Sequence, residues 1–110
     1  MKLPSKVKVG VATYTLTESS ALVGIGAHGL TFESGGRRGI QLQPGMPPAL
    51  ALHTLLHELM HAIHYEYGMH NTEDVNEEFI CDTVGHGFAQ IFMDNPKLLE
   101  YVVYLSCLKD

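Results

Sequence analysis

One segment near the middle of the chain, residues 54–63, contains two histidines and a glutamate, and all of its remaining residues are uncharged. The spacing of its apolar residues predicts a helix, which runs from residue 49 to about residue 67 and can end at Gly68. Side chains four residues apart on a helix lie on the same face, so His57 and His61 point in the same direction. The fold must therefore bury most of this helix while leaving its histidine face accessible.

The residues His57, Glu58 and His61 form a His-Glu-x-x-His pattern, which is typical of zinc hydrolases. Two imidazole nitrogens on one helix face can bind one zinc ion, and the adjacent glutamate can take a proton from a zinc-bound water. The alternative is a histidine-rich surface helix that matches the pattern by chance. The uncharged surroundings favour the metal site, with His57 and His61 as ligands and Glu58 as the general base.

The composition indicates a single domain spanning residues 1–110. Of these 110 residues, 45% are hydrophobic and 17% are charged, which suits a modest globular core. A net charge of −5 argues against nucleic acid as a partner, because phosphate-binding surfaces need clustered Lys and Arg. No apolar run approaches the ~20 residues needed to span a membrane, and the N-terminus has no apolar signal core. We therefore expect a cytoplasmic protein, in which the widely spaced Cys81 and Cys107 are small core residues rather than a disulfide or a zinc ribbon.

The first part of the chain has the patterns of a sheet. Apolar and polar residues alternate from Lys6 to Leu16, which predicts a strand. Residues 29–33 and 39–43 flank a segment with two adjacent glycines and predict a hairpin. These strands precede all the helical patterns.

Helical patterns follow the strands. After the helix at 49–67, a second helix is expected from about residue 75 to residue 93, with Gly85 and Gly87 in its middle. Residues 96–105 can form a short helix, although their β-branched and aromatic content also allows a strand. Strands followed by helices indicate an α+β fold, in which an antiparallel or mixed sheet packs on the two helices that carry the site.

A catalytic zinc ion usually has three protein ligands and one open position. Glu78, on the second helix, is our choice for the third ligand, because Asp82 follows it one turn later on the same face. Asp82 would accept the far ring N–H of a ligating histidine and fix its orientation. Glu77 is the rival ligand, but it points about 100° away from Glu78. The other explanation is an acidic helix start that complements the helix dipole.

The remaining histidines have less defined roles. His64 follows His57 by seven residues, about 10 Å along a helix, so a straight helix does not bring it to the same zinc ion as His57 and His61. His53 either lines the cleft or lies on its rim, and His86 is either a hydrogen-bond donor or a core residue. A donor to the developing oxyanion should exist. The candidates are His86, Tyr65, Tyr67, Tyr101, Tyr104 and His28, and the sequence does not choose among them.

With these residues in place, the chain resembles a very small gluzincin metallopeptidase over about residues 38–92. Residues 54–63 resemble the extended zincin helix, and Glu78 with Asp82 resembles the Glu-x-x-x-Asp segment of thermolysin-like enzymes. Residues 78–82 are also similar to the Glu-x-x-Ala-Asn segment of the ImmA/IrrE group, and short phage and prophage zinc peptidases have this appearance. The resemblance implies a mixed sheet whose edge strand, here Gly39 to Gln43, pairs with an extended peptide or protein substrate.

The expected function is that of a zinc-dependent metallopeptidase. Only sixteen residues separate His61 from Glu78, and no C-terminal helical domain provides the second wall of a thermolysin-like cleft, so a pro-peptide or a partner subunit could complete it. The second hypothesis is a non-catalytic, zinc-stabilised binding or regulatory module, whose closed site would take His86 or His64 as a fourth ligand. Glu58 favours the enzyme, because a purely structural zinc site does not need a base.

Overall fold

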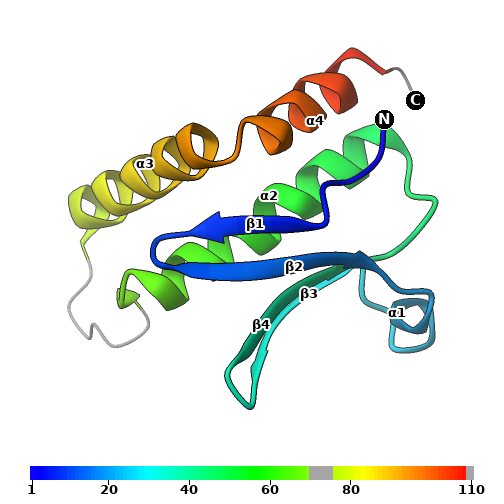
Figure 1. Cartoon of the computed structure of the whole chain (residues 1–110), viewed down its shortest axis with the longest axis horizontal. Coiled ribbons are helices and arrows are strands. Elements are labelled where there is room, and N and C mark those ends of the chain that lie inside the picture. The colour runs from blue at the N-terminus through cyan, green and yellow to red at the C-terminus, as the bar shows by residue number, and fades with distance from the viewer. Residues whose placement is uncertain (70–75, 109–110) are drawn as a thin grey trace.

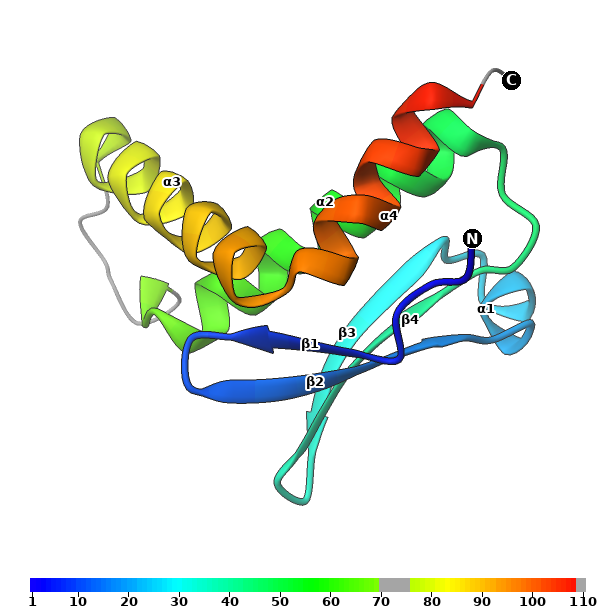
Figure 2. The ribbon, with the colours of Figure 1, turned by 45° about the horizontal axis from the view of Figure 1, so that its top comes forward.

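The computed structural model describes residues 1–69 and 76–108 as an α+β fold, in which a mixed sheet is covered on one face by helices (Figures 1 and 2). The strands are β1 (Lys6–Val9), β2 (Ala12–Glu18), β3 (Gly29–Ser34) and β4 (Arg37–Leu42). The helices are α1 (Ala21–Gly24), α2 (Pro48–Glu66), α3 (Glu77–Asp94) and α4 (Pro96–Cys107). No helix in the described ranges is long and apolar enough to cross a membrane.

The expected strand from Lys6 to Leu16 is a hairpin in the structure. Gly10 has a φ of +61°, which glycine adopts without steric cost, and the chain reverses there so that β1 pairs antiparallel with β2. The second hairpin was predicted correctly. It joins β3 to β4 through Gly35 and Gly36, whose φ angles of +58° and +80° suit a tight two-residue turn.

The order of strands in the sheet is β1-β2-β4-β3. Strand β4 pairs parallel with β2 on one side and antiparallel with β3 on the other. The expectation that Gly39–Gln43 forms an edge strand is therefore wrong. Strand β3 pairs with β4 on one side alone, so β3 is the edge strand at that end of the four-stranded sheet.

The opposite edge of the sheet is covered by a side chain. Asn95, between α3 and α4, accepts a hydrogen bond from the Lys8 backbone N–H and donates one to the Lys8 carbonyl, both at 2.8 Å. These two bonds imitate the pairing of a neighbouring strand. Asn95 also donates to the Ile91 carbonyl at 2.7 Å, which holds its amide in place.

The long helices agree closely with the sequence patterns. Proline begins both α2 and α4, where its missing N–H is not needed. Asn76 caps α3 by accepting a hydrogen bond from the Phe79 N–H at 2.8 Å. Residues 96–107 are helical, not a strand. Contrary to expectation, Cys81 and Cys107 are exposed.

The core lies between the sheet and α2, with α3 and α4 packed against the same helix. Gly87 is the point of closest approach of α3, since a Cβ there would lie 2.9 Å from the Ile63 side chain. This contact fixes which face of α3 meets α2. The fully buried core side chains are Val7, Val9, Ile40, Leu55, Leu59, Ala62, Ile63, Ile91 and Leu98.

Candidate metal centre

Helix α2 buries one face and exposes a row of side chains on the other. Leu55, Leu59 and Ile63 are completely buried, whereas His57 and His61 are exposed one turn apart. The Nε2 atoms of the two histidines lie 3.1 Å from each other. The helix thus presents the two imidazoles as a pair, as the sequence predicts.

The spacing of the pair fits a metal ion. Two histidines on a tetrahedral zinc ion, each about 2.0–2.1 Å from it, have nitrogens about 3.3 Å apart. The observed separation of 3.1 Å between Nε2 atoms is close to this value. His57, Glu58 and His61 are the one group of three His, Cys, Asp or Glu within residues 1–69 and 76–108 whose ligand atoms converge, all within 4.8 Å of one another. These residues could hold a metal ion.

Glu58 lies on the side of α2 that faces the edge strand β3. Its side chain is 7% exposed, and its Oε2 lies 3.9 Å from Nε2 of His57. The Thr31 hydroxyl on β3 lies 2.8 Å from the other carboxylate oxygen, Oε1, and 3.0 Å from the Glu58 carbonyl. At Gly29, a Cβ would lie 2.8 Å from Cγ of Glu58, so only glycine lets the strand pass this closely. Glu58 is therefore held between two elements, with one oxygen bonded and the other directed toward the histidines.

A cavity of about 450 Å³ opens in front of these residues, between β3 and the C-terminal half of α2. The side chains of His57, Glu58 and His61 form part of its wall, and β3 forms the opposite side. Its other lining residues are Tyr14, Gly29, Leu30, Thr31, Phe32, Glu33, His64 and Tyr65. The cavity gives the histidine pair access to a ligand that lies along β3.

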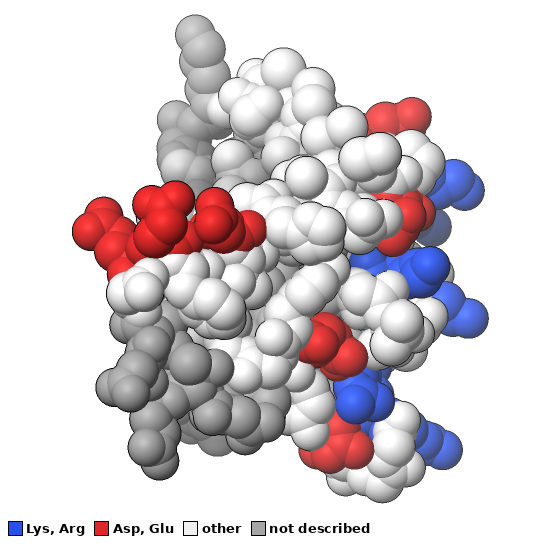
Figure 3. Space-filling model, turned by 90° about the vertical axis from the view of Figure 1, so that its left-hand side faces the viewer, with Lys and Arg blue, Asp and Glu red and all other residues white. Residues whose placement is uncertain are grey.

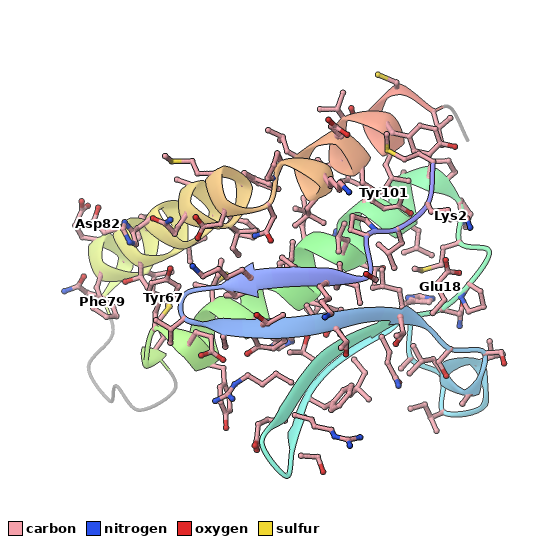
Figure 4. All side chains as sticks on the ribbon, in the orientation of Figure 1. Lys2, Glu18, Tyr67, Phe79, Asp82 and Tyr101 are labelled. Atoms are coloured by element: carbon pink, nitrogen blue, oxygen red, sulfur yellow. The ribbon has the colours of Figure 1, made fainter. Side chains whose placement is uncertain are left out.

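Glu78 and Asp82 lie apart from this group. Both are exposed in the first turns of α3, at the end of the molecule where Figure 4 labels Asp82 and Phe79 and where Figure 3 shows acidic side chains on the surface. Helix α3 contacts α2 through Gly87, and nine residues on a helix turn about 900°, so Glu78 lies half a turn from that contact. The roles of Glu78 as third ligand and of Asp82 as the partner of a ligating histidine stay predictions.

The structure separates the candidate oxyanion donors. The His86 ring packs edge-on against Tyr67, with centroids 5.8 Å apart, and Tyr101 and Tyr104 line a different hollow near Met1. Tyr65 shares the 450 Å³ cavity with His57 and His61. His28 lines an adjoining hollow of about 280 Å³ with His53, His57 and Glu58. Among the candidates in the described residues, Tyr65 and His28 thus lie beside the histidine pair.

Two residues of the site carry no signal in the sequence. Thr31 and Gly29 belong to an ordinary strand pattern, and nothing in that pattern shows that the strand passes Glu58. Their roles depend on how the sheet docks on α2, which periodicity does not reveal. An arrangement of a strand and a helix, rather than a local motif, orients the Glu58 carboxylate.

Comparison with protein-family models, with curated proteins and with solved structures finds no match for this chain. The site is therefore defined by its own geometry. That geometry consists of a His-Glu-His group able to hold a metal ion, on an α+β fold with a mixed sheet and helices on one face.

Proposed function

We propose that this protein is a zinc-dependent metallopeptidase with a small zincin-like fold. The observation that supports it most is that two histidine nitrogens and a buried carboxylate lie together at one point of α2. The histidine Nε2 atoms are 3.1 Å apart, and the buried Glu58 directs a carboxylate oxygen toward them. A structural metal site needs the ligands alone. A carboxylate held beside them by a separate strand is the arrangement that hydrolysis requires.

The catalytic roles follow from these positions. His57 and His61 would hold the zinc ion, which when bound supplies a Lewis acid that polarises the scissile carbonyl and acidifies a water molecule. Glu58 would take the proton of the attacking water on its free oxygen. It would then pass that proton to the amine nitrogen as the peptide bond breaks. Thr31 keeps the carboxylate in place through both transfers.

Strand β3 is suited to hold the substrate backbone. The Gln43 N–H donates to the His28 carbonyl at 2.8 Å, so the hydrogen-bonded pairs with β4 fall on the even-numbered residues of β3. Gly29, Thr31 and Glu33 then direct their backbone groups away from β4, toward the open edge. An extended peptide could pair there, beside Glu58, by strand addition. This role replaces the one expected for Gly39–Gln43.

The oxyanion of the transition state needs a hydrogen-bond donor as well as the metal. Tyr65 and His28 are the candidates that line hollows shared with His57. Tyr65 lies one turn after His61, and helical side chains lean toward the N-terminus of their helix. Its hydroxyl therefore leans toward the histidine pair, which makes Tyr65 the preferred donor.

The base assignment is tested by Glu58→Gln, which keeps the shape of the side chain but cannot accept the proton. Wild-type protein reconstituted with zinc should cleave members of a random quenched-fluorescence peptide library. The variant should bind one equivalent of zinc and lose cleavage by at least about 100-fold. Full activity in Glu58→Gln would refute the mechanism. Zinc binding with no cleavage by either protein, together with unfolding on chelation, would favour the zinc-stabilised binding module.

The ligand assignment is tested separately by metal content. His61→Ala should lose zinc after dialysis, as measured by elemental analysis, because one imidazole cannot hold the ion alone. His86→Ala is the matched control, since His86 packs against Tyr67 and away from the pair. The zinc content of Glu78→Gln, measured in the same series, tests whether Glu78 is the third ligand. Unchanged zinc in His61→Ala would exclude the pair as the ligand set.

A further inference from the structure

A partly buried ion pair lies beside the cavity, where α2 ends against the sheet. The carboxylate of Glu66 is 7% exposed and accepts a hydrogen bond from the Tyr14 hydroxyl at 2.6 Å. The same oxygen lies 2.7 Å from Nε of Arg38. The Arg38 Nε–H does not point along a hydrogen bond, so this contact is an ion pair. Nothing in the proposed zinc chemistry requires this pair.

The guanidinium of Arg38 does not line the 450 Å³ cavity, but it packs against a residue that does. Its central carbon lies 5.4 Å from the centre of the Tyr65 ring, in the geometry of a cation–π contact. Tyr65 lines the cavity with His57, Glu58 and His61, whereas Arg38 does not. Arg38 is thus held by Glu66 and in turn packs against the ring of Tyr65.

The arrangement restricts a side chain that would otherwise move. Tyr65 is 43% exposed, and an exposed tyrosine on a helix samples several rotamers. A planar guanidinium can form an ion pair at its edge and stack on a ring with its face, which an ammonium group cannot do. Glu66 thus keeps the guanidinium of Arg38 next to the Tyr65 ring, and Arg38 restricts the movement of that ring.

We propose that Arg38, anchored by Glu66, is a positioning residue that holds Tyr65 to donate its hydroxyl hydrogen bond to the oxyanion of the transition state. This inference rests on the proposed peptidase function and assigns the donor that the function needs. Tyr65 touches the reacting oxygen, while Arg38 acts only through Tyr65. No proton is transferred in this step.

Kinetics of the zinc-loaded 110-residue chain test both roles, with the library peptide that wild type cleaves fastest as the probe. Tyr65→Phe should lower kcat about 100-fold and change KM less than about 2-fold, because the donor acts mainly in the transition state. Arg38→Lys keeps the charge beside Glu66 and should lower kcat about 10-fold, since the ring loses its orientation. Arg37→Lys is the matched control, because Arg37 is exposed and its side chain alternates to the other face of β4. It should keep wild-type rates.

Two further measurements separate a catalytic role from a merely structural one. Arg38→Lys combined with Tyr65→Phe should be no slower than Tyr65→Phe alone, because a residue that only positions the Tyr65 hydroxyl has no effect once that hydroxyl is gone. Nuclear Overhauser contacts between Arg38 Hδ and the Tyr65 ring should be present in wild type. If Arg38→Lys destabilises the fold, Arg38→Met with Glu66→Leu removes both charges and should show the same loss of kcat.

The outcomes distinguish this inference from the function on which it rests. Cleavage by wild type with an unchanged kcat in Tyr65→Phe, or equal kcat in Arg38→Lys and Arg37→Lys, would overturn the inference and leave the peptidase function standing. Additive losses in the double variant would overturn the positioning role of Arg38. No cleavage and no binding of an N-phosphoryl dipeptide, a mimic of the tetrahedral oxyanion, would overturn the function itself and this assignment with it.

Discussion

At the scale of single residues, Glu58 is the best-defined group in the site. Its neighbour His57 is exposed, while Glu58 is 5% exposed and turned toward β3. The Thr31 hydroxyl has one proton and two acceptors within reach, Oε1 of Glu58 at 2.8 Å and the Glu58 carbonyl at 3.0 Å. A charged carboxylate is the stronger acceptor. The Thr31 hydroxyl therefore bonds mainly to the carboxylate, which holds the Glu58 side chain against β3.

Thr31→Val tests this contact, because valine keeps the shape of threonine and removes its hydroxyl. We expect kcat to fall about 10-fold, since a hydrogen bond to a charged group contributes about 1.5–3 kcal/mol and only part of this acts in the transition state. Thr31→Ser restores the hydroxyl and should recover most of the activity. Zinc content, measured in parallel, should be unchanged in both variants. A valine variant as active as wild type would mean that the helix alone positions Glu58.

At the scale of elements, the packing of α3 on α2 is decided by glycine. Gly87 faces Ile63 at a distance that no side chain allows, whereas Gly85, two residues earlier on α3, has no atom within 4 Å of where a Cβ would lie. The sequence shows both glycines within an expected helix, but it does not show which one is in the contact. Only the structure distinguishes a glycine needed for close approach from one that merely weakens the helix.

The two glycines make a matched pair for a stability experiment. Gly87→Ala should destabilise the domain by about 1–3 kcal/mol, because the added methyl group overpacks the contact with Ile63. Gly85→Ala should instead stabilise it by up to about 1 kcal/mol, the difference in helix propensity between the two residues. Urea unfolding followed by circular dichroism measures both changes. Equal effects of the two substitutions would show that α3 does not dock on α2 through Gly87.

The elements were predictable to the extent that local patterns define them. The hairpin at Gly35 and Gly36 and the extent of α2 follow from turn and helix signals. The turn at Gly10 also changes the alternation of the apolar residues. The buried positions before it are odd-numbered (Val7 and Val9), whereas those after it are even-numbered (Tyr14 and Leu16). An unbroken strand cannot change its buried parity. The position of β3 at the edge and the direction of Glu78 depend on how the elements pack together, which local patterns do not define.

At the scale of the whole molecule, the two edges of the sheet differ. Asn95 covers β1 with a pair of 2.8 Å hydrogen bonds, whereas β3 directs alternate backbone groups toward its open side, next to the cavity. Exposed strand edges tend to pair with other chains, and proteins commonly block them. In the proposed function, a blocked edge at β1 and an open edge at β3 would direct strand addition to the side of the sheet next to Glu58 and the histidines of α2.

The contact between Tyr14 of β2 and Glu66 of α2 also makes the stability of the whole domain depend on pH in the alkaline range. Burial, followed by the hydrogen bond and the charge of Glu66, raises the pKa of Tyr14 well above its usual value of 10.0. Below about pH 10 the phenol is protonated in both the folded and the unfolded chain, so its contribution to stability is fully present. Above that pH the unfolded chain loses the proton while the folded chain keeps it. The free energy of unfolding must then fall by up to about 1.36 kcal/mol per pH unit from this group alone.

Tyr14→Phe should remove that part of the pH dependence. The variant loses the 2.6 Å hydrogen bond to Glu66 and should be less stable than wild type at pH 8, by about 1–3 kcal/mol. The gap should narrow as the pH rises from 10 to 11, because only wild type has the Tyr14 proton to lose on unfolding. Tyr104→Phe, which removes a hydroxyl outside this network, should follow the wild-type curve. Urea unfolding at each pH measures the three curves, and a constant gap between wild type and Tyr14→Phe would mean that Tyr14 is not the buried phenol that links Glu66 to the sheet.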